Sequence, residues 1–366
     1  MDLSEFFRTY KDLKENKPLG FEDPYHMMDT MNPLMRDAFL NKPTGYNPDE
    51  ICQYIALDGN KIVGTLFFFR NRFLVDGKEH GCQAGSTLYV HPDYRPRGIG
   101  ACALMQFVDL HPEKNTISNG ISQMAQPIYK ALGFSFFETP RYILLRKSRS
   151  VVETVLKTEN KIILPICWLG DIAFAIARFI TSLGNRIRMA KYSVERVYTC
   201  PQEVEDIVLE DGHRFKELHD KKWFDWSLKY DYNCDSRKKK ELFVVKNSKG
   251  DIVAFFLNKI KFFEQASHRG FKNVLLGTVS EWGIKNGEKI SEFDIQYLAT
   301  RNMPRNVDAC EVTSVDTATC KRFARHLFKK VGTVTMAVNM NSEIDEACKL
   351  PENWRIRIAG NDTLMD

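Results

Sequence analysis

The stretch Gly85–Ala101 (GSTLYVHPDYRPRGIGA) constrains the fold of this chain most strongly. Ser86–Val90 is rich in β-branched and aromatic residues and predicts a strand, and an apolar pattern of helical period begins at about Ile99. Gly98 and Gly100, in the loop before the helix, can adopt positive φ and have no Cβ. Successive backbone N–H groups can therefore approach a ligand at the positive end of the helix, an arrangement suited to phosphate or pyrophosphate.

Arg95 and Arg97 lie on the same loop, where a guanidinium can bind phosphate oxygens through paired, charge-assisted hydrogen bonds. The loop lacks the Gly-Lys-Ser/Thr ending of a P-loop and the three spaced glycines of the dinucleotide fingerprint. Its pattern, Arg95-x-x-Gly98-x-Gly100 directly after a strand, resembles the acetyl-CoA pyrophosphate loop of the GNAT superfamily of N-acetyltransferases. Taken alone, the pattern also fits a tight strand-to-helix turn with solvated arginines.

A second segment, Ser122–Phe134 (SQMAQPIYKALGF), strengthens the resemblance. Its apolar residues share one helical face, and Gly133 is a good residue to end a helix. Tyr129-Lys130-Ala131-Leu132-Gly133-Phe134 matches the superfamily's second signature, a helix that ends in Tyr-x-x-x-Gly-Phe. Ser122 stands where the superfamily often has Asn, so one hydrogen bond to the cofactor is in question. The two signatures together cover about Ile51–Leu145.

The resemblance implies acetyl-CoA as cofactor and assigns roles to individual residues. Tyr129 would donate a hydrogen bond or a proton to the sulfur, whereas a core tyrosine with a satisfied hydroxyl is the alternative interpretation. The cofactor-binding residues implied are Leu88, Tyr89 and Val90 along the pantetheine arm, Arg95, Arg97, Gly98, Ile99, Gly100 and Ala101 at the pyrophosphate, and Ser122. The general base is not specified, and the carboxylates and histidines near the strand are Glu79, His80, His91 and Asp93.

The length of 366 residues predicts about two domains. The 52 Lys and Arg against 47 Asp and Glu leave a charge of +5, spread along the chain, which suits an anionic cofactor and does not predict nucleic-acid binding. The nine cysteines include no Cys-x-x-Cys pair and no close Cys/His cluster, so we expect reduced cysteines and no metal site. The first residues are charged and lack the apolar core of a signal peptide, which favours a cytoplasmic protein.

The second half of the chain repeats the pattern of the first. The predicted elements are strands at Leu242–Lys246, Ile252–Lys259, Val274–Trp282 and Ala309–Ser314, and helices from about Glu288 and at Asp316–Val331. Placing Gly332 on Gly133 puts Phe328 on Tyr129, and the loop at 285–290 lacks the two spaced glycines. We therefore predict an α/β fold with a mixed sheet, in which two GNAT-like domains stand in tandem and the second has no working cofactor site.

The predicted domains are residues 1–150 (catalytic), 151–200 (helical linker), 201–345 (degenerate copy) and 346–366 (C-terminal tail). In the linker, Ile162–Leu183 is apolar but is interrupted by charged residues, among them Asp171 and Arg178. We expect a buried interdomain helix at about Asp171–Gly184 and no stable membrane insertion. A helix at a membrane surface is the alternative.

These patterns predict an acetyl-CoA-dependent N-acetyltransferase that acts on a small-molecule primary amine. A non-catalytic, acyl-CoA-binding sensor or assembly protein is the second hypothesis, and the intact Tyr129 beside an intact loop favours the enzyme. Four aromatic residues in WFDWSLKYDY resemble a segment of tandem acetyltransferase-like proteins associated with surface polysaccharide synthesis: Trp223, Trp226, Tyr230 and Tyr232. Aromatic platforms suit sugar rings, so these residues indicate an amino sugar as acceptor, and ordinary core residues are the alternative interpretation. A small amine, a peptide and an antibiotic remain open as acceptors, as do acyl chain length and oligomeric state.

Overall fold

The computed structural model describes residues 3–28, 33–110, 113–149, 152, 164–230, 239–265, 272–344 and 346–361. The first half contains β1 (Leu3–Thr9), α1 (Tyr10–Lys14), α2 (Pro33–Leu40), β2 (Ile51–Asp58), β3 (Lys61–Val75), β4 (Lys78–Val90), the 3-10 helix η1 (Pro92–Arg97), α3 (Ile99–Asp109), β5 (Thr116–Asn119), α4 (Gln126–Ala131) and β6 (Ser135–Leu145). The long helix α6 (Leu164–Met189) follows. The second half contains β7 (Ser193–Val197), α7 (Gln202–Leu209), β8 (Phe215–Glu217), α8 (Lys221–Lys229), β9 (Lys239–Lys246), β10 (Ile252–Gln265), β11 (Lys272–Ile284), α9 (Glu292–Arg301), β12 (Ala309–Thr313), α10 (Thr317–Arg325), β13 (Lys329–Asn339), three short 3-10 turns (Glu346–Lys349, Pro351–Asn353 and Ile358–Asn361) and β14 (Trp354–Arg355).

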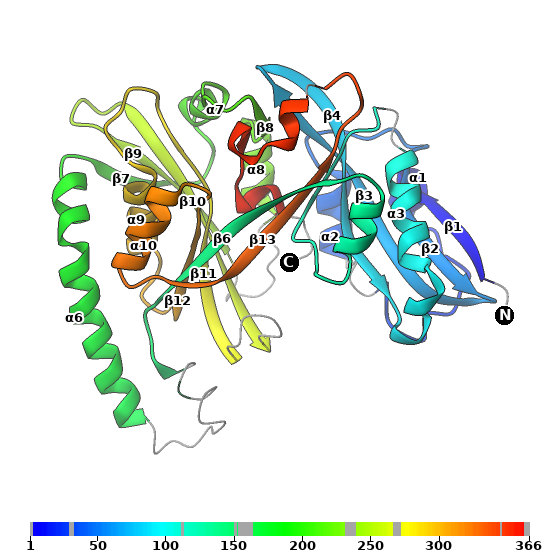
Figure 1. Cartoon of the computed structure of the whole chain (residues 1–366), viewed down its shortest axis with the longest axis horizontal. Coiled ribbons are helices and arrows are strands. Elements are labelled where there is room, and N and C mark those ends of the chain that lie inside the picture. The colour runs from blue at the N-terminus through cyan, green and yellow to red at the C-terminus, as the bar shows by residue number, and fades with distance from the viewer. Residues whose placement is uncertain are drawn as a thin grey trace.

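One mixed sheet runs through both halves, in the order β1-β2-β3-β4-β5-β13-β6-β12-β11-β10-β9-β7 (Figure 1). The last strands of the two halves are exchanged, because β13 inserts between β5 and β6 while β6 pairs with β12. Each half therefore needs the other to complete its sheet. The predicted α/β fold with a mixed sheet is confirmed, and the predicted boundaries at residues 150 and 201 stay a prediction.

The element order of the second half follows that of the first. The series β9-β10-β11-α9-β12-α10-β13 repeats β2-β3-β4-α3-β5-α4-β6, and in both series the two strands that flank the first helix pair in parallel, β4 with β5 and β11 with β12. In both halves the connecting helix packs on the sheet, α3 against β2, β3 and β4 and α9 against β10, β11 and β12. Two α/β units in tandem thus share one sheet.

The alignment between the two final helices differs from the predicted one. The helix α10 ends at Arg325, six residues before the predicted Val331, because Leu327 itself takes the left-handed conformation with φ of +68°. The amide of Phe328 then bonds to the carbonyl of Phe323 at 3.1 Å, as the amide of Phe134 bonds to Tyr129 at 3.1 Å. The prediction that Phe328 matches Tyr129 is wrong, and Phe323 is the counterpart; the missing hydroxyl is unchanged.

The prediction of a buried interdomain helix is also wrong. The helix α6 lies along the outer edge of the second half and beside the end of β6 (Figure 1). Its apolar side chains point outward: Ile166 is 65% exposed, Ile180 60% and Ile187 76%. The face toward the protein is largely polar, so the apolar composition did not indicate burial inside this chain.

The aromatic residues of α8 belong to the core. Trp223, Trp226 and Tyr230 are buried, and Tyr232 lies outside the described residues. The indole of Trp226 donates to the carbonyl of Ala38 at 2.9 Å, and Trp223 stacks on His219 with ring centroids 3.9 Å apart. These rings hold α2 against α8, and the three that the structure describes do not form a platform for a sugar.

Candidate active site

The loop between β4 and α3 leaves the start of a helix open to the surroundings. Gly98 has φ of +76°, and a Cβ added there would meet nothing within 4 Å. The helix α3 that follows has no side-chain cap and no acidic residue in its first turn. Ala101 and Cys102 bond back to the carbonyl of Gly98, whereas the preceding amides of Ile99 and Gly100 belong to the unpaired start of the helix. Positive helix charge and backbone donors converge at this point.

The loop is held rigidly on the strand. The Nε of Arg95 donates to the carbonyl of Val90 at 3.1 Å, and the hydroxyl of Tyr94 donates to Asp58 at 2.8 Å. Arg97 lies over the ring of Tyr94, with its guanidinium carbon 4.8 Å from the centroid. Both arginines are exposed, so their outer nitrogens are available to a phosphate beside the helix start.

The parallel strands β4 and β5 part immediately before this loop. They pair only at Gln83 with Thr116 and Ala84 with Ile117. On its other side β4 stays paired with β3 up to Val90, through a bulge at which Thr87 has φ of +55°. No described strand pairs with Leu88, Tyr89 or Val90 on the β5 side, so this edge of β4 is open except at the Val90 carbonyl, which accepts from Arg95. An amide-containing ligand can pair with such an edge as an added strand.

Tyr129 lies where these strands part. It is 5% exposed near the end of α4, and its hydroxyl donates to the Oγ of Ser118 on β5 at 3.2 Å. Burial raises the pKa of Tyr129, so the hydroxyl keeps its proton at neutral pH. Gly133, with φ of +82°, ends the helix as predicted and lets Phe134 pack edge-on against the Tyr129 ring. The residue can donate a hydrogen bond or a proton at this position.

A buried carboxylate approaches the same position from the opposite face of the sheet. Glu217, 7% exposed on β8, accepts hydrogen bonds from Asn71 of β3 at 2.9 Å and Asn119 of β5 at 3.4 Å. Because side chains alternate along a strand, Asn119 faces Glu217 while its neighbour Ser118 faces Tyr129. Glu217 and Tyr129 thus reach the end of β5 from the two sides.

The environment of Glu217 favours the neutral carboxyl more than water does. Burial raises the pKa of Glu217, and its described hydrogen-bond donors are neutral amides, with no cation in ion-pair contact. Lys42 lies nearby, and its Nζ donates to the carbonyl of Arg70 at 3.0 Å and weakly to Asn71 at 3.5 Å. Desolvation lowers the pKa of Lys42 to about 7. A carboxyl with a raised pKa beside a lysine with a lowered pKa is typical of a site that moves protons.

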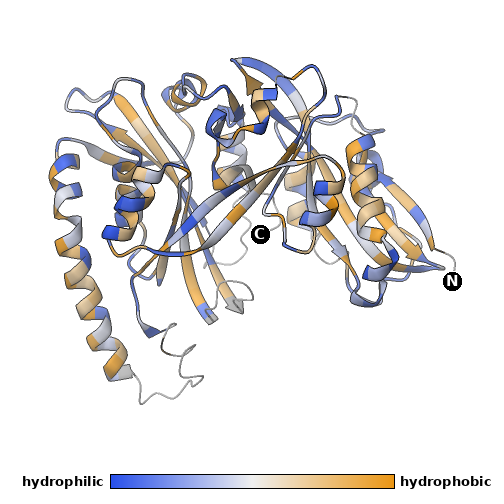
Figure 2. Cartoon of the chain, viewed as in Figure 1, coloured by the Kyte–Doolittle hydropathy of each residue, from blue (hydrophilic) through white to orange (hydrophobic). Residues whose placement is uncertain are grey.

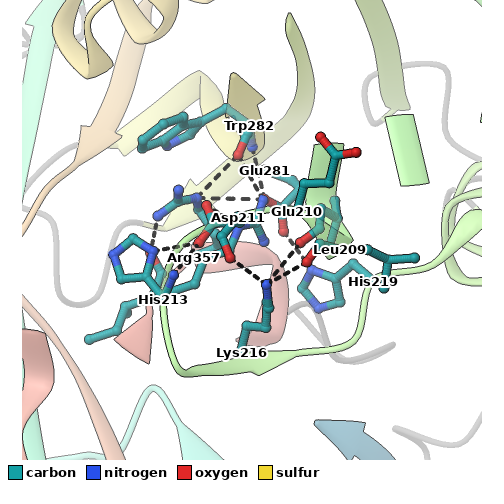
Figure 3. Close-up of polar contacts among 12 residues, drawn as sticks. Leu209, Glu210, Asp211, His213, Lys216, His219, Glu281, Trp282 and Arg357 are labelled. Atoms are coloured by element: carbon teal, nitrogen blue, oxygen red, sulfur yellow. Dashed lines mark hydrogen bonds and ion pairs between the residues drawn. The ribbon is translucent and has the colours of Figure 1, made fainter. Parts of the chain in front are cut away.

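A charged cluster beneath the site fixes the segment that carries Glu217 (Figure 3). Lys216 donates to the C-terminal carbonyls of α7 and its loop, at Leu209 (2.9 Å) and Asp211 (2.6 Å). His219 bonds to Glu281 at 2.5 Å, and Arg355 bonds to the same carboxylate at 2.6 Å. Although burial alone would raise it, the arginines and His219 lower the pKa of Glu281, which is therefore a permanent anion with a structural role.

The structure separates the residues that the sequence singled out. The glycine loop, the β4 edge and Tyr129 come together, and the exposed Ser122 caps the turn before α4 by accepting from Ala125 at 3.3 Å. Glu79 lies at the far end of β4, paired with Arg72 at 3.5 Å, as does His80 near Phe73. His91 stacks on Tyr25 in the loop, 3.7 Å from the exposed Asp93. No sequence pattern pointed to Glu217, because it comes from the second half and meets the site only through the fold.

Comparisons with known proteins agree with this geometry. A family model for the acetyltransferase (GNAT) domain matches residues 49–136. Across 97% of this chain and 84% of the other, the fold is similar to that of N-myristoyltransferase from Saccharomyces cerevisiae with bound myristoyl-CoA, at a TM-score of 0.55 and 12% identity. It is also similar to a probable N-acyltransferase from Enterococcus faecalis, with a TM-score of 0.53, 12% identity, and coverage of 93% and 73%. A search of curated proteins found no match to this chain.

Proposed function

Because the chain is a member of the GNAT superfamily through its domain at residues 49–136, we propose that it transfers an acyl group from acyl-CoA to a primary amine at the place where β4 and β5 part. The observation that carries this proposal is the meeting of three features there. They are an unpaired strand edge, a helix start without a cap or acidic residue, and a buried tyrosine hydroxyl.

The residues present fit an acyl-CoA. The Gly98 loop provides open space and backbone donors for the pyrophosphate, with Arg95 and Arg97 beside them. The free edge at Leu88–Val90 fits the amides of the pantetheine arm. When bound, acetyl-CoA supplies a thioester whose carbonyl carbon an amine can attack. We take acetyl as the acyl group, and chain length is decided by the assay below.

Two side chains of this protein would move the protons. The carboxylate of Glu217 accepts a proton from the ammonium of the acceptor, directly or through water, because burial raises its pKa and makes it a stronger base than a solvated carboxylate. Tyr129 gives its hydroxyl proton, or a hydrogen bond, to the departing thiolate. Their placement on opposite faces of the sheet keeps the acceptor side apart from the CoA side.

The acceptor is an amine that reaches the face of the sheet covered by α2 and α8. The burial of Trp223, Trp226 and Tyr230 removes the feature that favoured an amino sugar, so the acceptor is described by its amine alone. The partly exposed Lys42 and the amide of Asn71 are the polar groups that would meet it beside Glu217.

The test is release of free thiol from acetyl-CoA and from longer acyl-CoA esters in the presence of a panel of small amines, amino sugars and peptides. We expect amine-dependent thiol release with at least one acceptor and CoA binding by calorimetry. If CoA binds and no amine in the panel supports thiol release, the non-catalytic, acyl-CoA-binding hypothesis is favoured. If CoA does not bind, both hypotheses are wrong.

A further inference from the structure

The helix α6 turns its mostly polar face toward the protein and its apolar face outward, which is the opposite of the usual arrangement. The residues toward the protein recur at helical spacing and are mostly polar: Cys167, Asp171, Phe174, Arg178, Ser182, Asn185 and Met189. The opposite face carries large apolar side chains that are all exposed: Ile166, Leu169, Ile172, Ile176, Ile180, Leu183 and Ile187. Figure 2 shows hydrophobic colour along the outer length of this helix. A surface helix of a globular protein normally buries its apolar face.

Polar contacts attach α6 to the end of β6, to the residues that follow it and to the second half of the chain. Asp171 accepts from the amide and the hydroxyl of Ser148 at 2.6 and 2.8 Å. Arg178 donates to the carbonyls of Leu145 and Arg146 at 2.9 and 3.0 Å. Asn185 donates to Asp294 at 3.1 Å. The helix is long and apolar enough to cross a membrane, yet these bonds hold it flat along the protein, so it lies beside the fold with its apolar face free.

A cavity of about 400 Å³ opens between this helix and the body of the second half. Four arginines line it, two of them from α6 and two from the packed strands and α9: Arg146, Arg178, Arg186 and Arg301. No acidic side chain lines the cavity, and within the described residues none of the four forms an ion pair. Burial, together with a neighbouring arginine, lowers the pKa of Arg178 and of Arg301. An anion that enters would relieve this repulsion through paired guanidinium hydrogen bonds.

We propose that the second half docks on an anionic phospholipid membrane, with the outer face of α6 lying in the interfacial layer and the arginine cavity receiving a lipid phosphate. Phe179 lines the cavity and is exposed on α6, which makes the apolar face and the cationic cavity contiguous. A single phospholipid molecule, with acyl chains next to a phosphate, matches this arrangement of an apolar face next to a cationic cavity. The helix is about 39 Å long, a length typical of interfacial amphipathic helices.

Charge complementarity favours a lipid over a second copy of this chain. A partner copy would cover the apolar face with its own α6, but it would bring a second set of arginines and no described carboxylate on that face. An anionic surface satisfies both features at once, because it offers apolar chains to α6 and negative charge to the cavity arginines. The inference does not depend on the acyltransfer proposed above.

The test is flotation of the full-length protein with vesicles of phosphatidylcholine alone or with one third phosphatidylglycerol. We expect binding to the anionic vesicles and at least tenfold weaker binding to the neutral ones. The double variant Ile176→Asp/Ile180→Asp should lose at least tenfold in binding to anionic vesicles. Tyr198→Asp, which also adds a charge at a strongly exposed apolar residue, is the matched control and should bind like the wild type.

The cavity is tested separately with Arg301→Gln, which should weaken binding to anionic vesicles about three- to tenfold, while Arg301→Lys keeps part of it. Lys249→Gln, in the exposed β9–β10 turn, removes one charge elsewhere and should have little effect. Thermal unfolding confirms that each variant folds. Light scattering that finds a dimer abolished by Ile176→Asp, or binding of inorganic phosphate without binding to vesicles, would overturn the proposal. So would equal binding of the double variant and the wild type.

Discussion

The two halves of the molecule each have a helix start at the same point of the fold, and it is uncapped in the first half and capped in the second. At α3, Gly98 leaves the first amides uncapped and brings no carboxylate near them. At α9, Ser291 caps the amide of Asp294 at 3.2 Å, and the first turn carries Glu292 and Asp294. The helix start that α3 leaves open is therefore occupied at α9 by side chains of the protein itself.

The open edge of the parallel strands differs in the same way. Beyond its pairing with β11, β12 is closed by Gln296 of α9, which bonds to both the carbonyl and the amide of Thr313 at 2.8 and 3.3 Å. Ala103 stands at the same place in α3 and has no polar group to offer β5. With Phe323 in place of Tyr129, the second half also lacks the buried hydroxyl that the first half has at this position. The comparison teaches that the helix start and the strand edge are closed by internal contacts in the second half and are left open to a ligand in the first.

The largest effect is expected from the base. Glu217→Gln should lower kcat/KM about 10³- to 10⁴-fold, the upper part of the range for losing a general base. In the wild type, activity should rise with pH as Glu217 loses its proton, and the variant should lack this rise. If the activity of Glu217→Gln still rises with pH as in the wild type, the rise reports deprotonation of Lys42, whose pKa is lowered to about 7.

The stability of the same variant separates catalysis from folding. The pKa of folded Glu217 is raised, so its contribution to stability is complete below the unfolded value of 4.5 and is lost as pH rises through the folded value. Removing the charge should not lower the melting temperature at pH 8. Glu311→Gln is the contrasting change in the second half, because Glu311 forms a buried ion pair with Arg141. This variant should have a lower free energy of unfolding and an unchanged affinity for CoA.

A smaller loss is expected from the proton donor. Tyr129→Phe should lower kcat about 10²-fold, since water can replace part of a lost donor, and should leave CoA affinity nearly unchanged. The matched change is Phe323→Tyr, which puts a hydroxyl at the corresponding position of the second half and should create no activity in a Tyr129→Phe background. Single-turnover kinetics check both; an undiminished chemical step in Tyr129→Phe would make this tyrosine a core residue.

Local chemistry explains which parts of this site could be predicted from the sequence. The Gly98 loop and the Tyr129 helix are defined by short-range spacing, and Gly133 ends α4 with the positive φ that its lack of a Cβ predicts. Leu327 takes the same conformation without being glycine, and no pattern in the sequence indicates it. For this reason Gly332 was aligned with Gly133, and Phe328 with Tyr129, in place of Leu327 and Phe323. Glu217 joins the site through contacts with Asn71 and Asn119 that span 146 and 98 residues, beyond any local pattern.

The fold followed the same rule. Periodicity predicted the strands and helices of both halves, but the exchange of β6 and β13 depends on which edges are free after folding, and no periodicity records that. The helix α6 was predicted to be buried because its residues are apolar. Hydrophobicity indicates an apolar environment and does not say whether the protein provides it.

Binding of CoA can be compared at two matched glycines. Gly98 and Gly287 both have positive φ, +76° and +86°, and a Cβ at either would meet nothing within 4 Å. Valine at each should cost a similar free energy of unfolding, about 1–2 kcal/mol for the left-handed backbone. Only Gly98→Val should weaken CoA binding, by about tenfold or more. Calorimetry should also give one CoA per chain in the wild type; two per chain, or equal effects of the two valines, would contradict the asymmetry.

The smallest effect tests whether the second half can be reopened by removing its cap. Ser291→Ala deletes the hydroxyl that accepts from Asp294 and from Arg322 at 2.8 Å, and should lower the free energy of unfolding by about 1 kcal/mol. It should leave CoA stoichiometry unchanged, because Glu292 and Asp294 still place negative charge in the first turn of α9 and Gln296 still closes β12. Denaturant unfolding and a CoA titration measure the two quantities. A second CoA site in Ser291→Ala would mean that the cap alone, and not the acidic turn and the closed strand edge, distinguishes the two halves.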